Sequence, residues 1–105
     1  MTDWAADVKI YRPDADDAAI SGLLDTYRLV MSNRDSAYVA FSDPTEVETV
    51  KTNFLKKKLG LTESDEVLDA ALAEVGETLK GDRTKSRITV YYLLAEKFGK
   101  LGLFS

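Results

Sequence analysis

Apolar residues recur along the chain at the spacing of amphipathic helices. The clearest stripe follows Asp14 and Asp16, either of which can cap a helix. Its members return every three or four residues, as on one helical face: Ile20, Leu23, Leu24, Tyr27, Val30 and Met31. A shorter helix is predicted from Asp3 to Tyr11, because Pro13 blocks its continuation.

A third helix is predicted to begin at Asp43-Pro44-Thr45-Glu46. Asp43 can accept free backbone N–H groups, Pro44 suits the first helical position, and Glu46 can reach back as in a capping box. Its apolar side continues through Val47, Val50 and Phe54, and Gly60 with Leu61 predicts a closing Schellman turn.

A fourth helix is predicted after Thr62 and Asp65, which can cap it, and it is expected to end at Gly81. Its apolar stripe is again helical in spacing: Leu68, Leu72, Val75 and Leu79.

The segment from Lys85 to Phe98 is apolar on nearly every side, which is typical of a helix in the middle of a fold. Its Ile-Thr-Val-Tyr-Tyr opening also has strand character, so a buried strand is the alternative. The helix-forming ending before Gly99 favours the helix.

For residues 32–43 the pattern does not distinguish a loop from a single helical turn. The pattern predicts one all-α domain over residues 1–105, a compact bundle of four or five helices packed around the apolar C-terminal helix.

Composition narrows the chemistry that the chain can perform. Among its 105 residues there is no cysteine and no histidine. This removes Ser-His-Asp and Cys-His catalytic sets and most transition-metal sites. The acids Asp14, Asp16 and Asp17 suggest calcium, but Ala19 stands where a calcium loop needs glycine, so capping explains them better. No metal, no cofactor and no catalytic residue is expected, which makes an enzyme the less favoured class.

Charge and hydropathy indicate a cytoplasmic protein without a membrane segment. The first residues are acidic where a signal peptide is basic, and the longest apolar run, Val90 to Ala95, is too short to span a bilayer. The net charge of −4 divides into −6 over residues 1–50 and +2 over residues 51–105. The favoured interpretation is that these charges only keep the protein soluble. The alternative is that the unequal charge of the two halves forms a dipolar surface that binds a partner of complementary charge.

Two basic segments of the chain are candidates for binding nucleic acid. Lys51 and Lys56 to Lys58 form one, and Lys80, Arg83, Lys85 and Arg87 form the other. The acidic pI near 4.8 and the lack of a nucleic-acid motif favour solvated helix ends over a phosphate-binding face.

Four polar residues are candidates for a ligand pocket. Asn53 follows Val50 by three residues, so it is predicted on the apolar side of its helix as a hydrogen-bonded amide. Tyr91 with Lys85 or Arg87 could line an anion pocket. Packing with a hydrogen-bonded hydroxyl is the alternative for the tyrosine.

Large apolar groups near both chain ends are candidates for an interface: Trp4, Leu101, Leu103 and Phe104. Covering them in a two-fold dimer would hide a sticky surface. Folding back over the chain's own core is the alternative.

Two stretches of the chain resemble a known family. They are Val39 to Leu61, with its Phe41-Ser42-Asp43-Pro44 step, and Lys85 to Lys100, with its Val90-Tyr91-Tyr92-Leu93-Leu94 run. Together they resemble a family of small bacterial proteins of unknown function (DUF2853), over about Val8 to Leu101. The resemblance implies a bacterial, cytoplasmic, helical domain and supplies no catalytic residues.

The sequence therefore favours a small protein-interaction or self-association module, a homodimer or a partner of another protein. A small-ligand or anion-binding protein, or an enzyme, using Asn53, Lys85, Arg87 and Tyr91 is the second hypothesis. Weak nucleic-acid binding through the basic segments is the third.

Overall fold

The computed structural model describes residues 3–33, 35–82 and 84–105. The helical elements follow in chain order: α1 (Trp4–Tyr11), α2 (Asp17–Thr26), α3 (Arg28–Ser32), α4 (Pro44–Val50), the π-helix η1 (Lys51–Lys58), α5 (Asp65–Thr78), α6 (Arg87–Lys97) and the 3₁₀ turn η2 (Leu101–Leu103). The predicted all-α fold is confirmed. None of the described helices is both long and apolar enough to cross a membrane.

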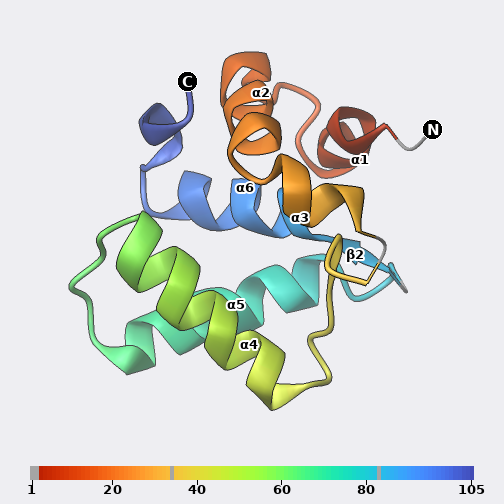
Figure 1. Cartoon of the computed structure of the whole chain (residues 1–105). Helices are drawn as coiled ribbons and strands as arrows, with labels where there is room; N and C mark the ends of the chain where they lie inside the picture. Colours follow the sequence, from red (N-terminus) through yellow and green to blue (C-terminus); the bar gives the residue numbers. More distant parts are fainter. Residues whose placement is uncertain (1–2, 34, 83) are drawn as a thin grey trace.

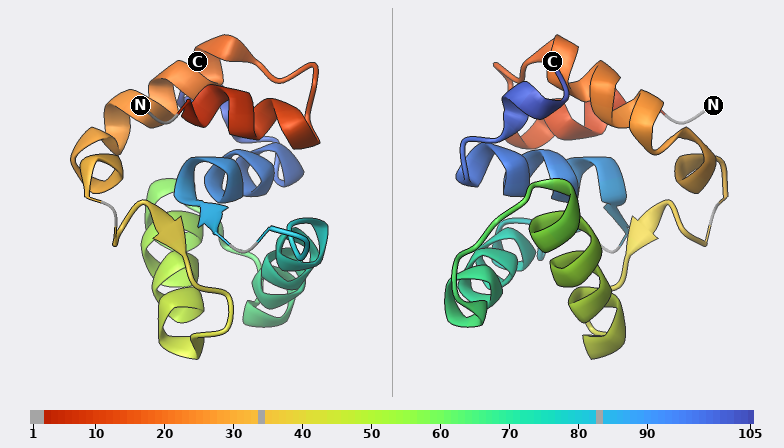
Figure 2. Two further views of the ribbon diagram at one scale, coloured as in Figure 1. Left: turned by 90° about the vertical axis from the view of Figure 1, so that its right-hand side faces the viewer. Right: turned by 60° about the vertical axis from the view of Figure 1, so that its left-hand side comes forward.

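Helix α6 lies in the middle of the molecule (Figure 1). Helices α1 to α3 cover one side of it, and α4, η1 and α5 cover the other, as both views of Figure 2 show. Every residue from Arg87 to Ala95 is buried. The all-round apolar pattern of this segment therefore predicted its central place correctly.

Short polar side chains begin the helices as the sequence indicates. Asp3, Asp16 and Asp43 each accept a backbone N–H of the helix that follows. Two details of the prediction are wrong. Ser64, rather than Thr62 or Asp65, caps α5, and that helix ends at Thr78, before Gly81.

The long second stripe forms two helices instead of one. Tyr27, with φ −111° and ψ 24°, separates α2 from α3. Its ring packs edge-on against Tyr91, with 4.9 Å between ring centroids. The apolar spacing is kept across this break, which is why the sequence pattern does not reveal it.

The stretch after α4 is a π-helix, in which backbone bonds join residues five apart instead of four. The Leu59 N–H donates to the Phe54 carbonyl at 2.8 Å. The buried apolar positions of this stretch are therefore spaced by four and by five residues: Val50, Phe54, Leu55 and Leu59. Asn53 is turned outward and exposed. The prediction that this amide faces the core is wrong, because it assumed the spacing of an α-helix.

Gly60 ends this helix as predicted. It has a φ of 67°, which favours glycine, and the Leu61 N–H donates to the Leu55 carbonyl at 3.1 Å.

The segment left open between loop and helical turn contains a short strand. In an antiparallel pair, β1 (Tyr38–Val39) places Tyr38 opposite Ser86 and Val39 opposite Lys85 of β2 (Lys85–Ser86). Lys85 was predicted to open the last helix. It is held in the strand pair instead, and α6 begins at Arg87, whose N–H donates to the Ala37 carbonyl at 2.8 Å.

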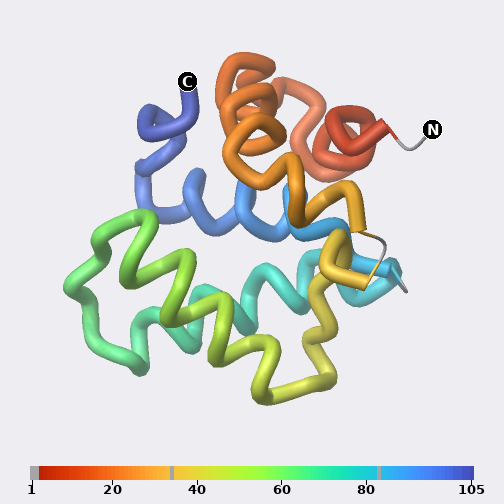
Figure 3. Tube along the Cα trace, in the orientation of Figure 1, coloured from red at the N-terminus to blue at the C-terminus, as the bar shows by residue number. Residues whose placement is uncertain are grey.

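After α6 the chain turns back toward α2, as the trace in Figure 3 shows. Gly22 of α2 allows a very close approach there, because a Cβ at this position would lie 1.7 Å from the Phe104 carbonyl oxygen. Phe104 is buried.

Candidate functional site

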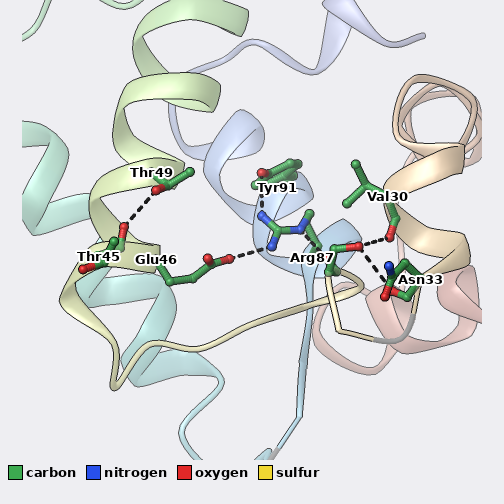
Figure 4. Close-up of polar contacts among 8 residues, drawn as sticks. Val30, Asn33, Thr45, Glu46, Thr49, Arg87 and Tyr91 are labelled. Carbon is green, nitrogen blue, oxygen red and sulfur yellow. Dashed lines mark hydrogen bonds and ion pairs between the residues drawn. The ribbon is translucent and has the colours of Figure 1, made fainter.

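The most connected polar side chain in the described structure is Arg87 at the start of α6 (Figure 4). Its Nε donates to the Ser36 carbonyl at 2.6 Å, its Nη1 to the Tyr91 hydroxyl at 2.9 Å, and its Nη2 to the Glu46 carboxylate at 2.6 Å. Arg87 therefore links α6 to the segment before β1 and to the first turn of α4. Glu46 was predicted to cap its own helix, and it binds Arg87 instead.

Burial and charge act in opposite directions on this cluster. Burial alone would lower the pKa of Arg87, but Tyr91 and Glu46 outweigh it and raise that pKa. The pKa of Tyr91 is raised by burial, although the neighbouring guanidinium opposes the shift. Arg87 is thus held as a cation with a partner at each of its three nitrogens. This arrangement stabilises the fold and leaves no nitrogen of the guanidinium without a bond.

Stacked aromatic rings continue from this cluster. Tyr91 lies parallel to Phe54, with 3.8 Å between centroids and 10° between planes. Phe54 stacks in turn on Phe104 at 6.1 Å, and the Lys58 ammonium lies 5.8 Å from the Phe104 centroid. Phe54 and Tyr91 are therefore packing residues of the core.

The four predicted ligand residues do not form one pocket. Arg87 and Tyr91 meet, as their spacing of four on a helix allows. Asn53 faces a surface hollow beside Pro44, Thr45 and other residues of α4 and η1. Lys85 lies elsewhere and donates through Nζ to the Asp82 carbonyl at 2.7 Å.

Acidic side chains meet several cations of the two basic segments. Lys51 is buried between Glu48 and Asp69, 3.0 Å from each, and both hydrogen bonds raise its pKa. Lys56 lies 2.7 Å from Asp65. In the second segment Lys80 pairs with Glu77 and Arg87 with Glu46. Arg83 lies outside the described residues.

The four residues predicted for an interface differ in how deeply their side chains are buried. Phe104 is folded onto the core, and Leu101 is half-buried. Leu103 is 56% exposed. Trp4 is half-buried and borders two surface hollows.

One hollow, of about 270 Å³, lies between α1 and the α2–α3 pair. Trp4, Leu24 and Met31 provide its apolar wall, and the exposed side chains of Asp25 and Arg28 also line it. We call it the Trp4–Met31 hollow.

The other hollow, of about 320 Å³, lies between α1 and the chain around β1 and β2. Its lining includes three carboxylates and one buried hydroxyl: Asp3, Asp7, Asp82 and Ser86. We call it the acidic hollow. Sequence reasoning missed it, because its residues come from three distant segments with no local motif.

These features define a small all-α domain whose most buried charges bind other groups of the same chain. The chain belongs to the family described as "Protein of unknown function (DUF2853)", whose model matches residues 3–102. The resemblance inferred from two stretches is thus confirmed over almost the whole chain. A comparison with curated proteins finds no match.

Proposed function

We propose that this domain is a self-association module, and that two copies meet through the Trp4–Met31 hollow. The observation that carries the proposal is the combination of an apolar hollow with opposite charges beside it. Asp25 and Arg28 are both exposed, and neither forms an ion pair with another described residue. In a two-fold interface each residue meets the partner's equivalent surface, so Asp25 of one copy can face Arg28 of the other.

Apolar exposure near this hollow supports the same surface. Leu29, which follows Arg28 on α3, is 83% exposed, and it is the most exposed large apolar side chain in the described part of the chain. Burying such a side chain is worth about 1.5–3 kcal/mol, so covering it on association is favourable. Phe104, by contrast, is already buried within its own chain and does not enter the proposed interface.

The mass in solution tests the proposal. Static light scattering at micromolar concentration is expected to give near twice the 11.6 kDa of one chain. Leu29→Ser, at the exposed position, is expected to shift the mass toward the monomer. Leu103→Ser is the control at another exposed apolar position, one that does not line the Trp4–Met31 hollow, and it is expected to leave the mass unchanged. A monomeric mass for the unmodified chain would refute the proposal.

Charge reversal then tests the pairing itself. Asp25→Arg and Arg28→Asp each place like charges across the two-fold axis, so each variant alone is expected to be monomeric. Mixing the two variants restores opposite charges and is expected to recover the dimer as a heterodimer. If the mixture stays monomeric while the unmodified chain is dimeric, the interface lies elsewhere.

A bacterial and cytoplasmic setting is part of this proposal, as the sequence leads us to expect. Fractionation of cells that express the full-length chain would test it. Recovery in the soluble cytoplasmic fraction is expected, and recovery with the periplasm or the membrane would contradict it.

A further inference from the structure

The acidic hollow combines negative charge with aromatic walls. Asp3 and Asp7 come from the start of α1, and Asp82 comes from the turn before β2. Trp4 and Tyr38 also line the hollow, and their rings meet edge to face with 5.6 Å between centroids. None of the described basic side chains lines it, and the nearby Lys85 ammonium is bound to the Asp82 backbone carbonyl at 2.7 Å. The three carboxylates exceed this one positive charge, so the hollow favours a cation.

Each carboxylate keeps acceptor capacity. Asp3 accepts the Ala6 N–H at 3.0 Å, and Asp82 accepts the Tyr11 hydroxyl at 2.8 Å. The hydroxyl of the buried Thr89 donates to Asp7. In each case one oxygen is used within the described part of the chain and the other is not, which leaves lone pairs for a donor.

Ser86 gives a second and independent indication. It is 2% exposed, and its Oγ is a buried side-chain atom without a hydrogen-bond partner among the described residues. Buried hydroxyls are normally paired, so an unpaired one in a residue that borders a hollow is a candidate partner for a donor that binds there. Ser86 lines the acidic hollow.

The arrangement suits an organic cation better than a metal ion. Within the described residues no three acidic side chains lie close enough together to hold a metal. An ammonium group has three N–H donors, and aromatic faces attract cations. The apolar side chain of Ile10, which also lines the hollow, can contact an aliphatic chain.

We propose that the acidic hollow binds a primary ammonium group on a short aliphatic chain, through Asp82, Asp7 and Ser86. Such a group occurs on a free alkylamine and on a lysine side chain of another protein. This site shares only Trp4 with the Trp4–Met31 hollow, and the proposal does not depend on dimer formation.

Trp4 is the only tryptophan of the chain and borders both hollows, so its fluorescence reports a ligand in either one, and the variants below locate the binding. The full-length protein is titrated at neutral pH and constant ionic strength with n-pentylammonium chloride. Saturable change of the emission is expected, and 1-pentanol, the neutral control, is expected to cause none. A parallel titration with Nα-acetyl-lysine methylamide distinguishes the two sources, since tighter binding of this probe indicates a protein lysine.

Variants locate the binding. Asp82→Asn keeps an acceptor for Tyr11 but loses the charge, and it is expected to weaken binding roughly tenfold. Ser86→Ala removes an unpaired hydroxyl, so the fold is expected to be at least as stable while binding weakens several-fold. Asp14→Asn removes an exposed acid that does not line the hollow and is expected to bind like the unmodified protein.

Several outcomes would overturn the assignment. One is an equal response to pentanol and to the ammonium probe. Another is unmodified affinity in both the Asp82→Asn and the Ser86→Ala proteins. Equal weakening by Asp14→Asn would show that the probe reports only net charge.

Discussion

At the scale of single residues, Arg87 shows what local spacing reveals and what it hides. Its contact with Tyr91, four positions later on the same helix, follows from helical geometry. Its other two partners, Ser36 and Glu46, are 51 and 41 residues away. No local pattern connects them. The sequence therefore identified Arg87 as notable, with ligand binding as a second hypothesis, and the structure adds three internal hydrogen bonds that the sequence did not indicate.

Arg87→Ala is expected to lower the free energy of unfolding by about 3 kcal/mol, because it leaves Glu46 and the Ser36 carbonyl without their partner. Arg12→Ala is the matched control. It breaks a 2.6 Å pair with Glu96 between half-exposed side chains, and it is expected to cost less than about 1 kcal/mol. Urea unfolding followed by circular dichroism measures both. Equal losses would contradict the structural role of Arg87.

At the scale of elements, the two ends of the α4–η1 segment were easier to predict than its interior. Asp43-Pro44 and Gly60 mark the limits of the α4–η1 segment correctly, because capping chemistry is local. The π-helical interior was missed. Its buried residues are four and five apart, whereas a template with three- and four-residue spacing places Asn53 inside. The strand pair β1–β2 was missed as well, since two residues each give no periodic pattern and the pairing is long-range.

The π-helical register predicts opposite results at two neighbouring positions. Asn53→Ala changes an exposed side chain and is expected to alter the free energy of unfolding by less than about 0.5 kcal/mol. Leu55→Ala leaves a cavity in the core and is expected to cost about 3 kcal/mol. Urea denaturation compares the two. A large loss for Asn53→Ala with a small one for Leu55→Ala would indicate an α-helix instead.

The contact between α2 and the C-terminal turn predicts a second pair of variants. In a helix, alanine is normally favoured over glycine by about 1 kcal/mol. At Gly22 the new Cβ would displace the Phe104 backbone, so Gly22→Ala is expected to destabilise the protein by about 2 kcal/mol as the Phe104 ring loses its burial.

Release of the C-terminal turn can be observed directly. Carboxypeptidase is expected to remove residues 101–105 faster from the Gly22→Ala protein than from the unmodified one, as mass spectrometry would show. Gly102→Ala is the control in the same segment, because nothing lies within 4 Å of its added Cβ. Equal digestion of all three proteins would mean that this contact does not hold the turn.

At the scale of the whole molecule, the architecture was predictable because α6 is apolar all round and must lie between two layers. The contacts between side chains at the surface were not predictable from the sequence. Which acids meet Lys51 or Lys56, and which segments line the acidic hollow, depends on how distant elements are placed. The same cross-element contacts also determine how stability depends on pH.

Stability is expected to be constant from about pH 6 to about pH 9 and to fall above about pH 10. The chain has no histidine or cysteine side chain to titrate in the lower range. Burial and the bond to Asp82 raise the pKa of Tyr11 from 10.0 to about 12, and burial also raises the pKa values of Tyr27 and Tyr91. A phenol with a raised pKa favours the folded state while protonated. Its contribution is therefore fully present below pH 10 and is lost as pH rises through about 12.

Lys51 adds to this alkaline loss, because its raised pKa gives a contribution to stability that is fully present below the unfolded value of 10.5 and is lost as pH rises through the higher pKa of the folded state. Urea midpoints measured at closely spaced pH values would show the profile. Tyr11→Phe removes one of the shifted phenols, so its stability is expected to fall less steeply between about pH 10 and about pH 12 than that of the unmodified protein. An identical slope would show that Tyr11 ionises as freely in the folded chain as in the unfolded one, and that its bond to Asp82 does not hold the proton.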